Sequence, residues 1–97
     1  MTRPTVKGLI TGDQIWFPNT YIAYSYILIG EIEGGAAVVL DSENGSLVAV
    51  LSELIEPTGT HYNVSERLYK ACEEAILNGS YYISGKVMEE ENLRIAA

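Results

Sequence analysis

The chain has one histidine and one cysteine, the side-chain types that most readily act as base, nucleophile or metal ligand near neutral pH. His61 has Glu53 and Glu56 nearby, but at no spacing that a zinc site uses. Cys72 falls on the apolar stripe of a predicted helix, whereas a catalytic thiol needs partial exposure beside a base. We therefore interpret His61 as a loop residue beside a helix start and Cys72 as a buried structural thiol. The sequence predicts no catalytic residue, no metal and no cofactor.

Two groups of carboxylates have spacings that invite comparison with metal sites and hydrolases. Residues 41–45 read Asp-Ser-Glu-Asn-Gly, but an EF-hand needs glycine at its sixth position and a carboxylate at its twelfth, where this chain has Ser52. Glu31 and Glu33 share a strand face, as the paired carboxylates of a glycosidase could. Such an enzyme needs a larger cleft than 97 residues can build. We interpret these groups as a hairpin loop and a solvated strand end, and predict that the chain is not an enzyme.

Aromatic residues are better candidates for binding. The chain has seven tyrosines and one tryptophan. Both residue types are enriched in protein interfaces because one side chain offers a ring and a hydrogen-bonding group. These rings could instead belong to the core. The residues predicted to bind a partner are Trp16, Tyr21, Glu31, Glu33, Asp41 and Glu43.

Acidic residues dominate the charge. Thirteen aspartates and glutamates oppose six lysines and arginines, which gives a net charge of −7. Such a surface repels phosphate backbones and anionic membranes, so we expect neither direct nucleic-acid binding nor membrane binding. It favours a basic protein partner, although the same charge would also suit a domain that only needs to stay soluble.

The cysteine count and the N-terminus bear on the compartment. A single cysteine excludes an internal disulfide, which fits a reducing environment. The first seven residues lack the apolar core of a signal peptide, and no apolar run reaches the ~18 residues of a membrane span. These features predict a cytoplasmic protein.

Hydrophobic patterning predicts an α+β fold in one acidic domain over residues 1–97. Residues 21–29 are the strongest strand, and both of its faces are largely apolar, as in a central strand covered on two sides. An Asn-Gly pair at residues 44–45 suits a hairpin turn. Pro57 and Gly59 are expected to close the β-rich half. The other predicted strands span residues 5–10, 14–17, 36–40 and 47–54, which together form an antiparallel meander.

One main helix is predicted over residues 64–77, packed on one face of the sheet. Asn63 can cap it, with Glu66 three residues later as in a capping box. Its apolar stripe consists of Val64, Leu68, Cys72, Ala75 and Ile76. Residues 80–97 are expected to form an arm or tail, with a last strand or extended segment over 81–84 and a short helix within 87–97.

Residues 26–77 resemble the C-terminal half of bacterial immunity proteins of the SUKH superfamily. Those sequences run from an apolar strand ending in Ile-Gly, through a Gly-rich turn and a hairpin, to an aromatic segment that begins a helix. The matching pieces are YILIG at 26–30, Gly34-Gly35, VVLD at 38–41, Asn44-Gly45 and YNVS at 62–65. The resemblance implies a protein that neutralises a toxin, often a nuclease or deaminase, by binding it. It transfers no functional residue.

The sequence therefore predicts a small acidic protein-binding domain of the immunity or inhibitor type, acting on a toxin or a nucleic-acid-processing protein. Two other hypotheses stay open. The chain could be a phage or mobile-element inhibitor that mimics nucleic-acid charge, in which case its carboxylates would form one row. It could also be an assembly domain that completes its sheet in a homodimer, most plausibly near residues 81–84.

Overall fold

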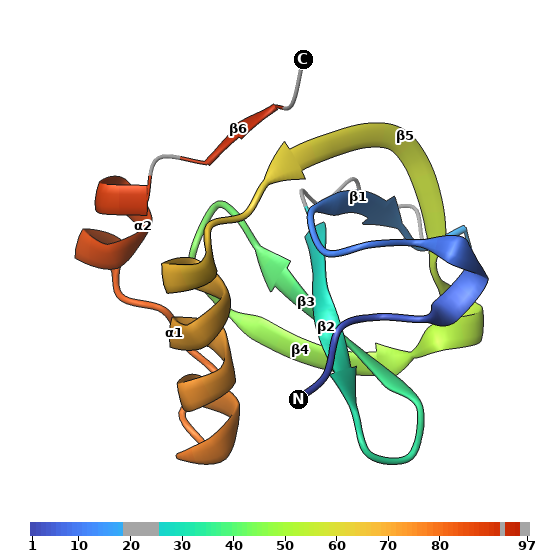
Figure 1. The fold of residues 1–97 in the computed structure, drawn as a ribbon, viewed down its shortest axis with the longest axis horizontal. Helices are drawn as coiled ribbons and strands as arrows, with labels where there is room; N and C mark the ends of the chain where they lie inside the picture. The colour runs from blue at the N-terminus through green and yellow to red at the C-terminus, as the bar shows by residue number, and fades with distance from the viewer. Residues whose placement is uncertain (19–25, 92, 96–97) are drawn as a thin grey trace.

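An antiparallel sheet forms the body of the computed structural model, which describes residues 1–18, 26–91 and 93–95 (Figure 1). In sheet order the strands are β4 (Leu47–Leu51), β3 (Ala36–Asp41), β2 (Tyr26–Ile32), β1 (Asp13–Trp16), β5 (Glu56–Asn63) and β6 (Arg94–Ile95). Helix α1 (Glu66–Leu77) follows β5, and the shorter α2 (Gly85–Glu91) precedes β6. This arrangement confirms the predicted α+β class, with a meander of strands and the main helix toward the C-terminus.

Strands β2 and β3 are buried on both faces because their side chains alternate between two apolar cores. Ile27, Val38 and Leu40 face helix α1, where they pack with Leu68 and Cys72. The central strand is therefore covered on two sides, as predicted. Residues 21–25 of the predicted strand lie outside the described residues.

The second core lies on the other side of the same strands. Leu28 and Val39 pack there with Ile15 of β1 and with Ile55, all fully buried. These partners come from segments that fold over the face opposite α1, so the sheet curls back on itself (Figure 1). A register shift between Leu28 and Gly30 accompanies this curl. The irregularity at Gly30 is therefore a bulge.

One predicted strand is absent, and another is shorter than predicted. Residues 5–10 contain a short 3-10 turn, η1 (Val6–Gly8), whose Lys7 has φ 50. The strand predicted over 47–54 ends at Leu51, and η2 (Ser52–Leu54) follows it.

Strand β5 replaces the closing loop expected around Pro57 and Gly59, and it places His61 in a strand. Its partner register with β1 jumps from His61 to Pro57, which leaves three residues of β5 opposite one of β1. Gly59, at φ +92, lies in this bulge. Gly59 suggested a turn in the sequence, but in the structure it forms part of a bulge within the sheet.

Helix α1 begins later than predicted. Ser65, and not Asn63, is its N-cap: the Ser65 hydroxyl accepts a hydrogen bond from the Leu68 N–H at 3.0 Å. Asn63 cannot cap the helix because it still belongs to β5 and pairs with Arg94. The predicted core position of Leu68 is confirmed, whereas Ile76 is only partly buried.

The C-terminal arm crosses the β3–β4 hairpin and the first residue of β4, and then leads into α2. Tyr81 accepts a hydrogen bond from the Leu47 N–H at 2.9 Å, and the Ile83 N–H donates to Gly45 at 2.8 Å. The segment predicted as a last strand or an extended arm is thus an arm joined to the sheet by an isolated bridge. None of the helices in the described residues is long and apolar enough to cross a bilayer.

Candidate partner-binding site

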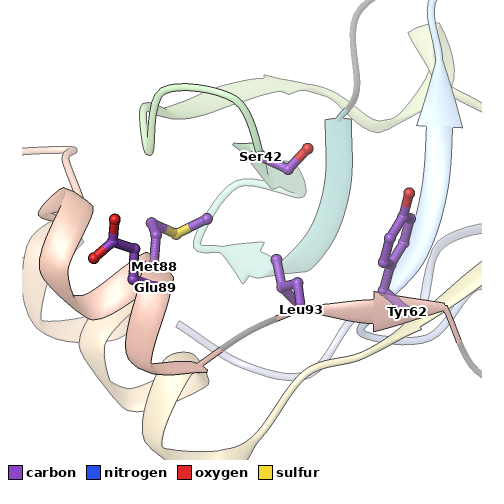
Figure 2. Close-up of a pocket in the computed structure, with 5 residues that line it drawn as sticks. All are labelled: Ser42, Tyr62, Met88, Glu89 and Leu93. Carbon is purple, nitrogen blue, oxygen red and sulfur yellow. The ribbon is translucent and has the colours of Figure 1, made fainter.

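A cleft of about 470 Å³ opens where α2, the end of β5 and the β3–β4 hairpin meet (Figure 2). Five residues from four separate segments line it: Ser42, Tyr62, Met88, Glu89 and Leu93. Figure 2 shows the Met88 side chain turned toward Leu93 and Ser42, and the Glu89 carboxylate turned outward at the rim. The cleft therefore combines an apolar floor, two hydroxyl groups and a carboxylate at its edge.

Ion pairs hold α2 in place beside the start of α1. Arg67 of α1 contacts Glu90 at 2.8 Å and Glu91 at 3.3 Å, and the Ser65 hydroxyl also donates to Glu91. Glu89, which precedes these two glutamates, has no ion pair within the described part of the chain. Its charge is therefore available to a partner.

The hairpin that carries Ser42 is fixed by its own polar groups. Asp41, only 8% exposed, accepts a hydrogen bond from the Glu43 N–H at 2.9 Å, and its backbone carbonyl accepts one from Gly45. A Cβ atom on Gly45 would lie 2.2 Å from the Ile83 carbonyl oxygen, so the hairpin and the arm are in close contact. Asp41 thus shapes the hairpin, while Glu43 is exposed beside Ser42.

Tyr62 forms the wall opposite α2. Its backbone is locked into the sheet by a 2.7 Å hydrogen bond from its N–H to the Gly12 carbonyl. Its hydroxyl makes no hydrogen bond to any other described residue, which leaves it able to donate to or accept from a ligand.

The other predicted carboxylates lie elsewhere. Glu31 accepts hydrogen bonds from the N–H groups of Thr5 at 2.6 Å and Val6 at 2.9 Å, so it holds the N-terminal segment. Glu33 is exposed in the β2–β3 turn. This turn is at the opposite end of β3 from Asp41, about 17 Å away along a six-residue strand. The predicted carboxylates therefore form two separate groups.

Trp16 is 48% exposed at the end of β1. It lies in register with Glu56 of β5, which pairs with Lys7 at 2.8 Å. The neighbouring ring of Phe17 packs edge-on against Tyr26 at the second core. Trp16 is thus a half-open ring on the surface, whereas Tyr21 lies outside the described residues.

His61 makes one contact that the sequence did not reveal. Its Nδ1 lies 2.9 Å from the Asp13 carboxylate, whose other oxygen accepts a hydrogen bond from the Ile10 N–H. An aspartate and the histidine that it orients are two of the three members of a catalytic triad. No serine, threonine or cysteine side chain of the described residues hydrogen-bonds to His61. The His61–Asp13 contact joins β5 to β1.

Cys72 is fully buried, as predicted, and burial raises its pKa to about 12. A thiol with so high a pKa is protonated at neutral pH and is a poor nucleophile. Within the described residues no group of three or more His, Cys, Asp or Glu side chains could hold a metal ion.

The sequence indicated only part of this site. It placed acidic residues on the hairpin beside Ser42, but it gave no reason to single out Tyr62, Met88 or Leu93. Comparison with family models, with curated proteins and with solved structures found no match to this chain. The resemblance to SUKH immunity proteins stays a prediction.

Proposed function

We propose that this domain acts by binding a basic protein, and that a lysine or arginine side chain of that protein enters the cleft. The observation that carries the proposal is the composition of the cleft. Tyr62, Met88 and Leu93 can pack along the aliphatic stem of such a side chain. The Glu89 carboxylate points away from these residues in Figure 2 and would rotate toward the cleft to meet the charge. The hydroxyl of Tyr62 adds a hydrogen-bond acceptor.

The charge balance of the surface supports a basic partner. Six basic residues face thirteen acidic ones, and Arg3, Lys7 and Arg67 are already engaged in ion pairs within the chain. The exposed carboxylate of Glu89, which lines the cleft, and that of Glu43, which follows the lining residue Ser42 in the chain, make no ion pair in the described structure. A partner with a positive surface would be steered toward this end of the molecule.

We further propose that binding neutralises the partner, as in immunity or inhibitor proteins, and that the domain itself is not an enzyme. The resemblance to the SUKH superfamily supports this role. A basic nucleic-acid-processing toxin is the class of partner that an acidic inhibitor would suit, because such a protein must itself attract phosphate. A small inhibitor needs a binding surface and a side chain that anchors the partner. The cleft offers the surface, and the half-exposed ring of Trp16 offers the anchor.

The test begins by capturing partners from the native host with the tagged domain. The association rate of the purified complex is then measured at several salt concentrations. Salt screens attraction between separated charges, so association should slow markedly from low to physiological salt while dissociation changes less. A salt-independent association rate would show that the acidic surface serves solubility only.

A further inference from the structure

Strand β4 is an edge of the sheet that carries no charge. Residues 47–52 read Leu-Val-Ala-Val-Leu-Ser, and three apolar side chains near this edge are well exposed: Val48 at 38%, Leu51 at 58% and Leu54 at 43%. Natural proteins usually protect such an edge with charged residues, proline or a bulge. This strand has none of these devices, so an open edge requires a different explanation.

The register of β4 on β3 shows which of its backbone groups point outward. Val48 pairs with Val39, and Val50 pairs with Ala37. The backbone N–H of Asp41 donates to the carbonyl of Ser46. Hydrogen bonding alternates along an antiparallel pair, so the even-numbered residues of β4 bond to β3 and the odd-numbered ones turn outward.

The chain itself confirms this alternation. The N–H of Leu47 points outward and donates to the Tyr81 carbonyl at 2.9 Å. The arm thus covers the first outward position of β4. No described backbone group outside β4 and η2 bonds to the next two, Ala49 and Leu51, although the Leu51 carbonyl, as the N-cap of η2, already accepts the first bond of that turn. The backbone edge at Ala49 and Leu51 is therefore left open, next to Leu47, which already bonds to the arm.

We infer that a second copy of this chain pairs with β4 across this open edge. In the antiparallel register that uses Ala49 and Leu51, Ala49 of one copy lies opposite Leu51 of the other, and a twofold axis passes beside Val50. A register shifted either way would need Leu47, which the arm occupies, or Glu53, which belongs to η2. The free part of the edge is therefore complementary to itself.

The lack of charge on the open edge of β4 also favours a second copy of the chain, and not the basic partner, as the molecule that binds there. Two chains of net charge −7 repel each other, and they can approach closely only where neither presents carboxylates. Residues 48–51 of β4 carry no carboxylate, and the nearest one, the exposed Glu53 of η2, lies just past the paired segment. A basic partner would instead be drawn to the acidic end with the cleft. The paired edge is short, so its area falls below the ~1,200 Å² of a stable interface and the dimer should form only at high concentration.

The first test needs no substitution. Amide hydrogen exchange is followed by NMR at low and high protein concentration. The N–H groups of Ala49 and Leu51 should exchange several-fold more slowly at high concentration, while those of Val48 and Val50, which already bond to β3, should change little. Equal exchange of Ala49 and Leu51 across the whole range would overturn the inference.

A cross-linking test checks the register. Opposed Val50 residues would form a non-hydrogen-bonded pair with Cα atoms about 4.5 Å apart, within the range of a disulfide. Val50→Cys should therefore give a covalent dimer with a mild oxidant. Val48→Cys, on the same face but about 13 Å from its copy along the strand, should not. Cross-linking of both variants to the same extent would contradict the register.

A third measurement follows the dimer by sedimentation. The apparent mass should rise above the monomer mass of 10.6 kDa with concentration. Leu51→Lys should abolish this rise, whereas Leu77→Lys, at a leucine 77% exposed on α1, should not. A wild-type chain that stays monomeric at millimolar concentration would overturn the inference. It would leave the proposed function intact, because that function is tested separately through the salt dependence of partner association.

Discussion

The guanidinium of Arg67 on α1 donates to the carboxylate of Glu90 on α2 across 2.8 Å. These residues are 23 positions apart, and their contact holds one wall of the cleft against the body of the domain. The Arg67 side chain is 68% exposed, so the pair should add at most ~1 kcal/mol to global stability. Its importance is local.

Replacement of Arg67 by Met should therefore loosen α2 more than it destabilises the whole domain. Amide exchange in α2 should accelerate several-fold, and the affinity for the captured partner should fall. Lys70→Met, which removes the same charge from an exposed position of α1, is the matched control. If both variants weaken binding equally, the docking of α2 is not what shapes the cleft.

The packing of α1 gives a second prediction. Leu68 is fully buried in the core between α1 and the sheet, so Leu68→Ala should destabilise the domain by ~2–5 kcal/mol. Leu77 is 77% exposed, and Leu77→Ala should change stability by less than ~0.5 kcal/mol. Urea unfolding of both variants checks the pair of values, and similar effects would contradict the orientation of the helix.

The N-cap can be tested separately. Ser65→Ala removes the acceptor for the Leu68 N–H and should cost ~1 kcal/mol. Asn63→Ala changes an exposed side chain in β5 and should cost less than ~0.5 kcal/mol. The opposite ranking in thermal or urea unfolding would restore Asn63 as the cap.

Cys72 predicts a dependence on alkaline pH. Burial raises its pKa to about 12 from the ordinary value of 9.0, so the folded chain keeps its proton at pH values where the unfolded chain has lost it. Stability from this group should therefore be unchanged below pH 9 and should fall as pH rises from 9 toward 12. Cys72→Ala should remove this component of the decline, and its persistence at full size would assign it to other groups.

The same burial should limit the reactivity of the thiol. At pH 8 a thiol reagent should modify native Cys72 far more slowly than the unfolded chain, because the reactive thiolate forms mainly after opening. Fast labelling of the native protein would mean that α1 opens readily.

The sequence correctly predicted the strands and turns whose local residue pattern matches the burial and pairing they have in the fold. The two-sided apolar pattern around Leu28 and the Asn44-Gly45 pair predicted β2, β3 and their hairpin partner. Strand β5 was missed because Pro57 and Gly59 indicate a loop, and only pairing with β1 through a bulge makes that segment a strand. The partner strand β1 lies more than forty residues earlier in the chain, so the local sequence around Pro57 and Gly59 gives no sign of it.

The site was harder to predict for the same reason. Glu31 looked available in the sequence, yet it binds backbone N–H groups 25 and 26 residues away. Met88 and Tyr62 line one cleft only after the arm has crossed the β3–β4 hairpin and Arg67 has fixed α2. Contacts of this kind depend on the completed fold, whereas the acidic character of the surface could be read from composition.

Trp16 provides a test of the aromatic anchor. Because it is 48% exposed, Trp16→Ala should change stability little, but it should cost ~2 kcal/mol or more of binding free energy if the ring is buried by the partner. The loss should appear mainly as faster dissociation. Unchanged dissociation would place Trp16 outside the interface and leave the cleft as the binding surface.

The central claim is that the cleft receives a basic side chain, and charge reversal at its rim tests this most directly. Glu89→Lys and Glu33→Lys make the same change in net charge, but Glu89 borders the cleft and Glu33 lies in the β2–β3 turn at the far end of β3. The affinity of each variant for the captured partner should be measured at physiological salt, where long-range steering is largely screened. The account predicts at least a tenfold loss for Glu89→Lys and a much smaller loss for Glu33→Lys. Equal losses, or a larger loss for Glu33→Lys, would contradict it.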